Sequence, residues 1–394
     1  MIDALSKMFD KLVGLHKTSP MRHRWLMYLK SAKSASIYTA NCYGDIVQKT
    51  TRNRDSNMEL LRIMAIFLIL FVHANFKSLG VVTSNHINGD FLDSFFRILF
   101  QFFGVIGVNV FILLSGWYGI SIKAIKTYSI LFQCVFYASL FYFLNIYFFD
   151  LPFSFKSFKE CFLLTSDYWF VKSYLLLYLL SPVLNEFAKN VRRPIFKSVL
   201  IGLYAYQFIF AWLFYESTDY FNCGYSPLSF INLYLLARFL RLHVRISYNN
   251  KTLVCALFLS NLVGTVIYVL PSLIRMGGVG LGLLLQSYVS PLVIVNAIIL
   301  LLMFYNFQFR SSVINTLATA CFATYLIHGN AHVINYYSDW FSYLHDKYYI
   351  WLFWLLVVIS CLIIYILSFI IDQFRIYIWR TIMRVTKISA EYHQ

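Results

Sequence analysis

Arg62 and His73 flank the apolar run IMAIFLILFV, and they are the two side chains in this sequence whose types and spacing most clearly suit chemistry. At about 100° per residue, the step of eleven residues turns a helix by three full turns plus about 20°, so both side chains project from one face. At about 1.5 Å per residue, they lie about 16 Å apart along the helix axis. Ionisable residues in such an apolar segment are costly to bury and therefore indicate a functional role.

Each of these two side chains suits a different chemical role. The imidazole of His73, with an ordinary pKa of about 6.5, can remove a proton from a hydroxyl group near neutral pH. The guanidinium of Arg62 can bind a phosphate through two N–H groups at once. The simpler alternative is that Arg62 reaches a membrane surface or pairs with Glu59, while His73 caps the last turn. The shared face favours a joint role.

The composition predicts that the elements which position these residues lie in a membrane. Of the 394 residues, 60% are hydrophobic and 13% are charged, against about 25% charged residues in a soluble domain. A soluble domain of this size has too small an interior to bury so many apolar side chains, so lipid must contact the excess. The aromatic share of 20% agrees, because Trp and Tyr favour membrane interfaces.

Ten apolar stretches are long enough to cross a bilayer, which takes about 20 residues of helix. The sequence therefore predicts an all-α fold, a polytopic bundle of about ten transmembrane helices. Residues 150–167 are too polar to span and are expected at an interface, and the glycine-rich residues 271–287 are expected to form a loop or a re-entrant segment. The predicted spans are 58–77, 96–118, 128–149, 168–186, 197–215, 226–243, 252–270, 288–307, 313–337 and 350–371.

The positions of Lys and Arg predict the side of the membrane on which each loop lies. With the N-terminus in the cytoplasm, 25 of the 33 Lys and Arg residues fall in cytoplasmic segments and five in external segments. This asymmetry is the positive-inside pattern, so both termini are predicted to be cytoplasmic. The net charge of +16 follows from the same bias, and nucleic acid is not expected as a partner.

The chain divides into three predicted parts. Residues 1–57 form a basic cytoplasmic segment with an amphipathic helix near its start, residues 58–371 form the transmembrane domain, and residues 372–394 form a basic cytoplasmic tail. The seven cysteines are scattered and include no C-x-x-C pair. Neither a disulfide framework nor a zinc site is therefore predicted.

Four motifs follow one another along the predicted spans. The first is NMELLRIMAIFLILFVHA, in which an Arg, ten residues and a His occur in sequence, and it is followed by GVNVFILLSGWYGI, YWFVKSYLLLYLLSPVLNEF and YLIH. In these motifs the chain resembles the acyltransferase-3 family of membrane proteins, over residues 55 to about 371. The third motif is similar to that of bacterial surface-polysaccharide O-acetyltransferases. The chain departs from the family after the second motif, where Lys123 and Lys126 replace an arginine pair and lack its bidentate fork.

The resemblance implies a reaction, a co-substrate and a location. Family members usually transfer an acyl group from acyl-coenzyme A to a sugar hydroxyl. We therefore expect an integral membrane O-acyltransferase that takes an acyl group, most simply acetyl from acetyl-CoA, on the cytoplasmic side. The expected acceptor is a hydroxyl of a cell-surface or exported polysaccharide, and the expected location is the bacterial inner membrane. No permanently bound cofactor and no metal is expected.

The resemblance also indicates where the donor would bind. Arg62, Lys123, Lys126 and Arg238 lie at predicted cytoplasmic ends of spans, where the phosphates of coenzyme A would approach. Ordinary positive-inside charge is an equally good account of the two lysines. An extended pantetheine arm has a length comparable to the separation of Arg62 and His73, so the thioester would reach His73. Arg62 and His73 are thus the predicted catalytic residues, with His73 as general base.

Residues near the predicted outer boundary would bind the acceptor. Lys172, Tyr325 and His328 are the candidates for substrate binding. The carbonyl of the thioester also needs a donor for its developing oxyanion, and Asn75, Ser115, Lys172 and Tyr325 are the alternatives for that role. Tight helix packing beside the following glycine is the simpler account of Ser115.

A different class of function also fits ten spans with buried charges. A transporter or flippase of a lipid-linked sugar or small solute would have the same composition. The shared face of Arg62 and His73, together with a basic inner rim, favours the acyltransferase, since no pair of broken helices is evident in the sequence. A glycan polymerase would need a larger external loop than the 18 residues between the first two predicted spans.

Overall fold

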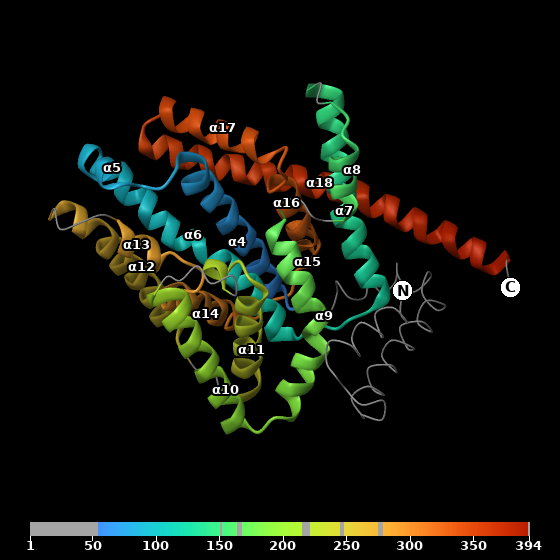
Figure 1. The fold of residues 1–394 in the computed structure, drawn as a ribbon, viewed down its shortest axis with the longest axis horizontal. Coiled ribbons are helices and arrows are strands. Elements are labelled where there is room, and N and C mark those ends of the chain that lie inside the picture. The colour runs from blue at the N-terminus through green and yellow to red at the C-terminus, as the bar shows by residue number, and fades with distance from the viewer. Residues whose placement is uncertain are drawn as a thin grey trace.

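Helices account for all regular structure in residues 54–149, 152–163, 168–214, 221–244, 248–274 and 279–392, which the computed structural model describes (Figure 1). The prediction of an all-α fold is confirmed for these residues, and the predicted N-terminal amphipathic helix lies outside them. The helices are α4 (Ser56–Val72), η2 (His73–Lys77), α5 (Ser84–Gly89), α6 (Phe91–Tyr118), α7 (Ala124–Phe149), α8 (Phe155–Leu163), α9 (Trp169–Asn190), α10 (Arg193–Tyr206), η3 (Gln207–Leu213), η4 (Asn222–Gly224), α11 (Pro227–His243), α12 (Asn250–Leu273), α13 (Gly280–Leu285), α14 (Pro291–Tyr305), α15 (Ser312–Leu317), η5 (Ala318–Ala320), α16 (Cys321–His328), α17 (Ile334–Lys347) and α18 (Ile350–Tyr392).

Six helical segments in the described residues are long and apolar enough to cross a bilayer, which indicates a multi-pass membrane protein. The other predicted spans correspond to α9, α11, α14 and the α15–α16 segment, which are shorter or less apolar. The count of ten spans and the cytoplasmic location of both termini therefore stay predictions. The six segments are Ser56–Lys77, Phe91–Tyr118, Ala124–Phe148, Arg193–Leu213, Asn250–Leu273 and Ile350–Arg384.

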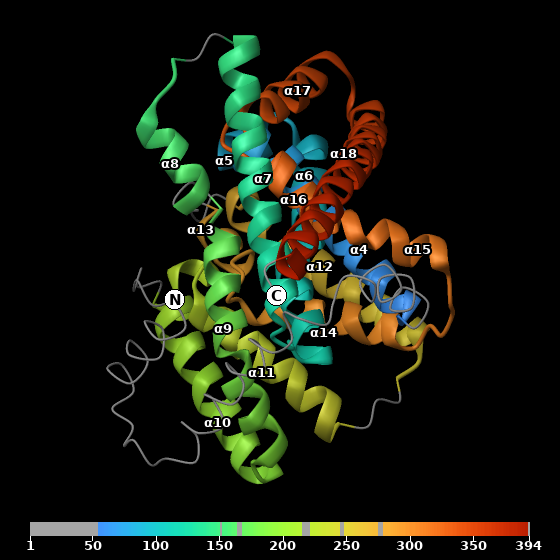
Figure 2. The same cartoon turned by 90° about the vertical axis from the view of Figure 1, so that its right-hand side faces the viewer.

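The prediction of one continuous helix over residues 313–337 is wrong. The helix ends at His328, and α17 starts six residues later at Ile334. The side chain of Asn330 stabilises this break, because its Oδ1 accepts from the backbone N–H of His332 and its Nδ2 donates to the hydroxyl of Tyr168. The break allows α17 to turn back beside α18, as Figure 2 shows at one edge of the bundle.

The last helix extends beyond the predicted span 350–371, through residues assigned from sequence to a cytoplasmic tail. Asp372 and Arg375 on this helix are buried and form an ion pair, with Nε of Arg375 at 2.8 Å from the carboxylate. Gln133 and Tyr137 of α7 donate to the same carboxylate. Neutralised and hydrogen-bonded in this way, the two charges lie inside the bundle and join α18 to α7.

Helix α4 lies at the centre of the fold, in contact with α6, α14, α15, α16 and α18. Its closest neighbour is α6, and Gly107 permits the approach. A Cβ atom at Gly107 would lie 2.8 Å from the carbonyl oxygen of Ala65 on α4. Small residues that let two backbones approach are typical of helix contacts in membranes. The helix that carries Arg62 and His73 is therefore held firmly within the bundle.

At each end of α4, a side-chain hydrogen bond connects this part of the chain to the end of another helix. Where α4 begins, Nδ2 of Asn57 donates to the carbonyl of Phe304, 2.9 Å away. Beyond its other end, the hydroxyl of Ser342 donates to the carbonyl of Ser78, at 3.2 Å. Asn57 and Phe304 were both predicted near the cytoplasmic boundary and Ser78 and Ser342 near the outer one, so the alternation of helix ends agrees with the predicted order.

Candidate active site

Arg62 lies in the second turn of α4, where it forms an ion pair with Glu59 on the same helix. Its Nη1 is 2.5 Å from Oε2 of Glu59, and Nη1 of Arg54 lies 3.8 Å from the other carboxylate oxygen. The Arg62–Glu59 ion pair, which the sequence offered as a simpler role for Arg62, is therefore present. Among the described residues the pair uses one guanidinium nitrogen, and 31% of the Arg62 side chain is exposed, so further N–H groups of the fork can donate to a second anion.

Positive charge accumulates around Arg62 from residues at the start of α7. Lys126 interacts electrostatically with Arg62, Arg54 and Lys123. Like charges that interact in this way repel one another, and a bound anion would relieve that repulsion. The structure thus brings together three of the four residues predicted to bind the donor, namely Arg62, Lys123 and Lys126.

Arg238, the fourth predicted donor residue, lies on α11 beside the C-terminal end of α6. Its Nη1 is 3.5 Å from the carbonyl oxygen of Trp117, and its Nε is buried without a hydrogen-bond partner among the described residues. Arg241, one turn further along, lies over the rings of Trp117 and Tyr305, at 5.1 and 5.6 Å from their centroids. Arg241 is therefore engaged in cation–π packing, whereas Nε of Arg238 has no hydrogen-bond partner among the described residues.

His73 lies at the opposite end of α4, where it begins the π-helical segment η2. Such segments are rare and frequently occur at functional sites. Nδ1 of His73 is 3.1 Å from Nε2 of His328, and Nδ1 of His328 is 2.6 Å from the carbonyl oxygen of Thr324. His73 is half-buried, whereas only 1% of His328 is exposed. His328 therefore lies behind His73, and its predicted contact with substrate stays a prediction.

Tyr337 from α17 belongs to the same cluster, and the sequence did not indicate it. Its ring centroid is 5.9 Å from that of His328, and its hydroxyl donates to the carbonyl of Leu70 at 2.6 Å. The backbone N–H of His73 donates to this same carbonyl, so Tyr337 supports the turn of α4 that ends at His73. No sequence signal would have found it, because only the break after His328 turns α17 back onto α4.

Asn75 does not meet the requirement for an oxyanion donor. Its Nδ2 donates to the carbonyl of Arg97 at 2.7 Å and to Oε1 of Gln101 at 3.3 Å, and 1% of the residue is exposed. Both amide hydrogens therefore have partners within α6. Asn75 instead holds η2 against α6, which fixes the backbone that carries His73.

Ser115 lies at the Arg62 end of the site and not at the His73 end. Its hydroxyl is 3.3 Å from that of Tyr174, which interacts with the charge of Arg62. A Cβ atom at the adjacent Gly116 would lie 2.5 Å from the carbonyl of Tyr234 on α11. The Ser-Gly pair is therefore a point of tight helix packing, as the simpler account held, and Ser115 is far from any thioester at His73.

Tyr325 and Lys172 complete the predicted substrate-binding residues. The ring of Tyr325 packs beside the histidine pair, with its centroid 6.1 Å from that of His328 and 5.3 Å from that of Phe170 on α9. Lys172, also on α9, has an exposed side chain. The structure thus brings Tyr325 to the His73 end of the site and leaves Lys172 at the surface of the bundle.

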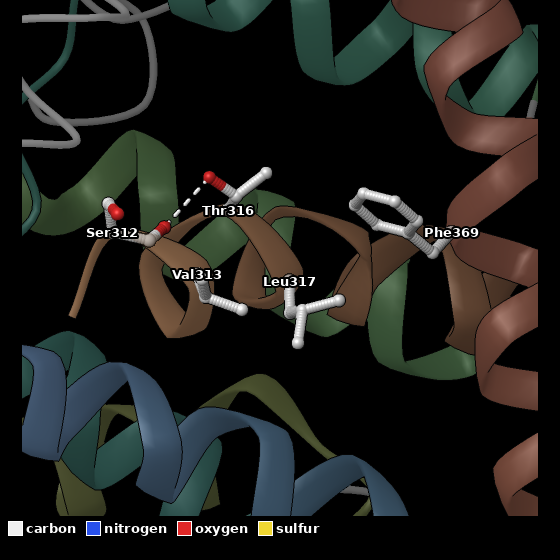
Figure 3. Close-up of a pocket in the computed structure, with 5 residues that line it drawn as sticks. All are labelled: Ser312, Val313, Thr316, Leu317 and Phe369. Carbon is white, nitrogen blue, oxygen red and sulfur yellow. Dashed lines mark hydrogen bonds between the residues drawn. The ribbon is translucent and has the colours of Figure 1, made fainter.

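Metal chemistry has no obvious centre in the described part of the chain, where no three His, Cys, Asp or Glu side chains converge as ligands. A hollow of about 350 Å³ lies between α15 and α18 and contains no charged residue (Figure 3). The hydroxyl of Thr316 in its wall donates to the carbonyl of Ser312 within the same helix. This hollow includes neither Arg62 nor His73, and it is distinct from the candidate site. Its lining residues are Ser312, Val313, Thr316, Leu317 and Phe369.

Comparison with known proteins identifies the family. The model of the acyltransferase-3 family, described as an acyltransferase domain, matches residues 55–373, which is most of the chain and includes every site residue predicted from the sequence. No curated protein and no solved structure matches the chain. With its apolar helices and this match, the chain is a multi-pass membrane protein that belongs to the acyltransferase-3 family.

Proposed function

We propose that this protein is an integral membrane O-acyltransferase of the bacterial inner membrane. It moves an acyl group, most simply acetyl, from cytoplasmic acyl-CoA to a hydroxyl of a cell-surface or exported polysaccharide. The observation that carries the proposal is the placement of Arg62 and His73 on one central helix, about 16 Å apart along its axis, with a basic cluster at one end and a histidine pair at the other.

The basic cluster suits the phosphates of the donor. Arg62, Lys123, Lys126 and Arg238 offer guanidinium and ammonium donors around one end of α4 and the adjoining end of α6. Charge-assisted bonds from such groups are the strong interactions of phosphate recognition. An extended pantetheine arm has a length comparable to the Arg62–His73 separation, so a donor bound by its phosphates at this end would present its thioester near His73.

The transfer itself requires one proton to move. His73 removes the proton from the acceptor hydroxyl while the hydroxyl oxygen attacks the thioester carbonyl. The carbon–sulfur bond then breaks as the new ester forms, and the thiolate of coenzyme A leaves with the proton that His73 received. Atoms and charges balance without a further reagent. Tyr325 lies beside the histidine pair and is therefore our candidate for contact with the acceptor or the oxyanion.

Compositional analysis of surface polysaccharide tests this function. We expect ester-linked acyl groups to disappear from the polysaccharide when the gene is deleted and to return with the wild-type gene but not with His73→Gln. Unchanged acylation in the deletion strain would contradict the proposal.

A second assay separates the enzyme from the transporter or flippase alternative. Membranes that contain the protein should move label from acyl-CoA to polysaccharide, which transport alone does not do. The family match supports the transferase, because it is to an acyltransferase domain. Movement of a lipid-linked sugar across the membrane without transfer of label would instead favour the transporter.

A further inference from the structure

We propose that His328 is a positioning residue that selects the tautomer of His73 and leaves Nε2 of His73 as the proton acceptor. This inference rests on the proposed function, in which His73 acts as the base, and it specifies which atom accepts the proton. It is carried by two successive hydrogen bonds, which join the carbonyl oxygen of Thr324 to the ring of His328 and that ring to the ring of His73.

The first contact fixes the tautomer of His328. A backbone carbonyl can only accept, so Nδ1 of His328, 2.6 Å from the carbonyl oxygen of Thr324, must carry the hydrogen. In a neutral imidazole the other nitrogen is then an acceptor. Nε2 of His328 therefore presents a lone pair to His73.

The second contact transmits that choice to His73. Its Nδ1 lies 3.1 Å from the lone pair of His328 Nε2, so Nδ1 of His73 must be the donor. Nε2 of His73 is left with its lone pair, on the side of the ring away from His328. A histidine whose second nitrogen is held in this way has a defined tautomer and ring orientation, as in metal sites and catalytic triads.

The surroundings make His328 suited to this role. Aromatic rings of Tyr325 and Tyr337 flank it, and no ion pair among the described residues involves either histidine. Lys77, on the same helical segment, interacts electrostatically with His73. A neutral imidazole thus stands where hydrolytic triads have a carboxylate.

The arrangement also accommodates the proton that catalysis delivers. When Nε2 of His73 takes the acceptor's proton, Nδ1–H still donates to Nε2 of His328, and the positive charge is stabilised by that bond. The pair holds one added proton in this geometry. A second would put hydrogens on both facing nitrogens and break the 3.1 Å contact.

Histidine tautomers are observable directly, without any transfer assay. We would label the nine histidines of the full chain with ¹⁵N and record two-bond nitrogen–proton spectra by solid-state NMR in lipid bilayers, assigning His73 by difference with His73→Gln. The wild type should show the Nδ1–H tautomer for His73. His328→Leu should lose this preference, and His328→Gln should keep it, because the amide oxygen can accept from Nδ1–H. An Nε2–H tautomer in the wild type overturns the inference.

Kinetics provide the second arm. His328→Leu should lower kcat roughly 10–100-fold, as loss of partners behind catalytic or metal-bound histidines does, with the KM for acyl-CoA unchanged. His328→Gln should recover part of the loss. His345→Gln, which removes a histidine bound to Asp93 at 3.1 Å, is the matched control and should retain wild-type kcat.

The two arms distinguish failure of this inference from failure of the proposed function. A His328→Leu variant with wild-type kcat overturns the positioning role. If the wild type transfers no acyl group but shows the expected tautomer, the hydrogen-bond assignment is supported and the acyltransferase proposal is the part that fails. The His328→Gln spectrum keeps the test decisive if His328→Leu does not fold.

Discussion

His73 combines the features expected of a base that must meet substrate and still be held in place. It is half-buried, it begins a π-helical segment, and its inner nitrogen contacts His328. Arg62, by contrast, shares a carboxylate with Arg54 and stays partly exposed. One residue is oriented for proton transfer and the other is available for binding, and their substitutions should therefore have different kinetic effects.

His73→Gln should abolish transfer while donor binding stays intact. Glutamine keeps similar size and hydrogen bonding but cannot take a proton, so the rate should fall roughly 10²–10⁴-fold if general-base catalysis is lost. Label transfer from acyl-CoA measures the rate, and calorimetry with acyl-CoA measures binding. The wild-type rate should also rise with pH through one ionisation and then level off, because only neutral imidazole accepts a proton. A His73→Gln enzyme with near wild-type turnover would rule out the base.

Arg62→Ala should weaken binding of acyl-CoA while the protein still inserts and folds. Loss of a charged hydrogen bond of about 1.5–3 kcal/mol corresponds to a Kd roughly ten- to more than a hundredfold higher. Arg62→Lys should recover part of the affinity, because the charge remains and the planar fork is lost. Arg310→Ala, at an exposed arginine near the same end of the bundle, is the control. Normal donor binding by both Arg62 variants would make the residue structural.

At the scale of helices, polar side chains at a few buried positions hold the bundle together. Asn75 joins η2 to α6, and Asp372 joins α18 to α7. In the second case a fully buried carboxylate accepts from Gln133, Tyr137 and Arg375 at once. Removing either Asp372 or Arg375 leaves the opposite charge buried without compensation.

Asp372→Ala should destabilise the protein by about 3–5 kcal/mol, the usual cost of breaking a buried ion pair. The measurement is the temperature of thermal unfolding in detergent, followed by fluorescence-detected size exclusion. Asp346→Ala provides the control, because 84% of that side chain is exposed. The double variant Asp372→Leu/Arg375→Leu should recover most of the lost stability, since no unpaired charge remains. Equal unfolding temperatures for the two single variants would show that the buried pair is dispensable.

At the scale of the whole molecule, the positive-inside pattern predicts which loops lie on each side of the membrane. Cys223 lies in the partly exposed turn before α11, on the predicted outer side, and Arg192 lies before α10 on the predicted inner side. An impermeant thiol reagent added to intact cells should label wild-type protein, and Cys223→Ser should remove that labelling. Arg192→Cys in the Cys223→Ser background should be labelled only after permeabilisation. The reverse pattern would invert the predicted orientation.

Local properties of the chain determined the fold class and the two principal residues. Apolar segments of sufficient length specify helices in lipid, because every backbone polar group must be satisfied within its own segment. Helical periodicity alone then places Arg62 and His73 on one face, since the regular α-helix continues from Arg62 to Val72, the residue before His73. The family motifs depend on the same local spacing, and the family match extends over residues 55–373.

Contacts between distant residues were decided only by the tertiary structure. His73 and His328 are 255 positions apart, and their 3.1 Å contact depends on how α4 and α16 pack and on the break after His328. The same packing gave Asn75 partners that exclude it as an oxyanion donor and brought Tyr337 against the turn before His73. A single sequence records which groups are present and their local spacing. The partners of each group depend on the register and crossing of helices, which side-chain packing across the whole bundle determines.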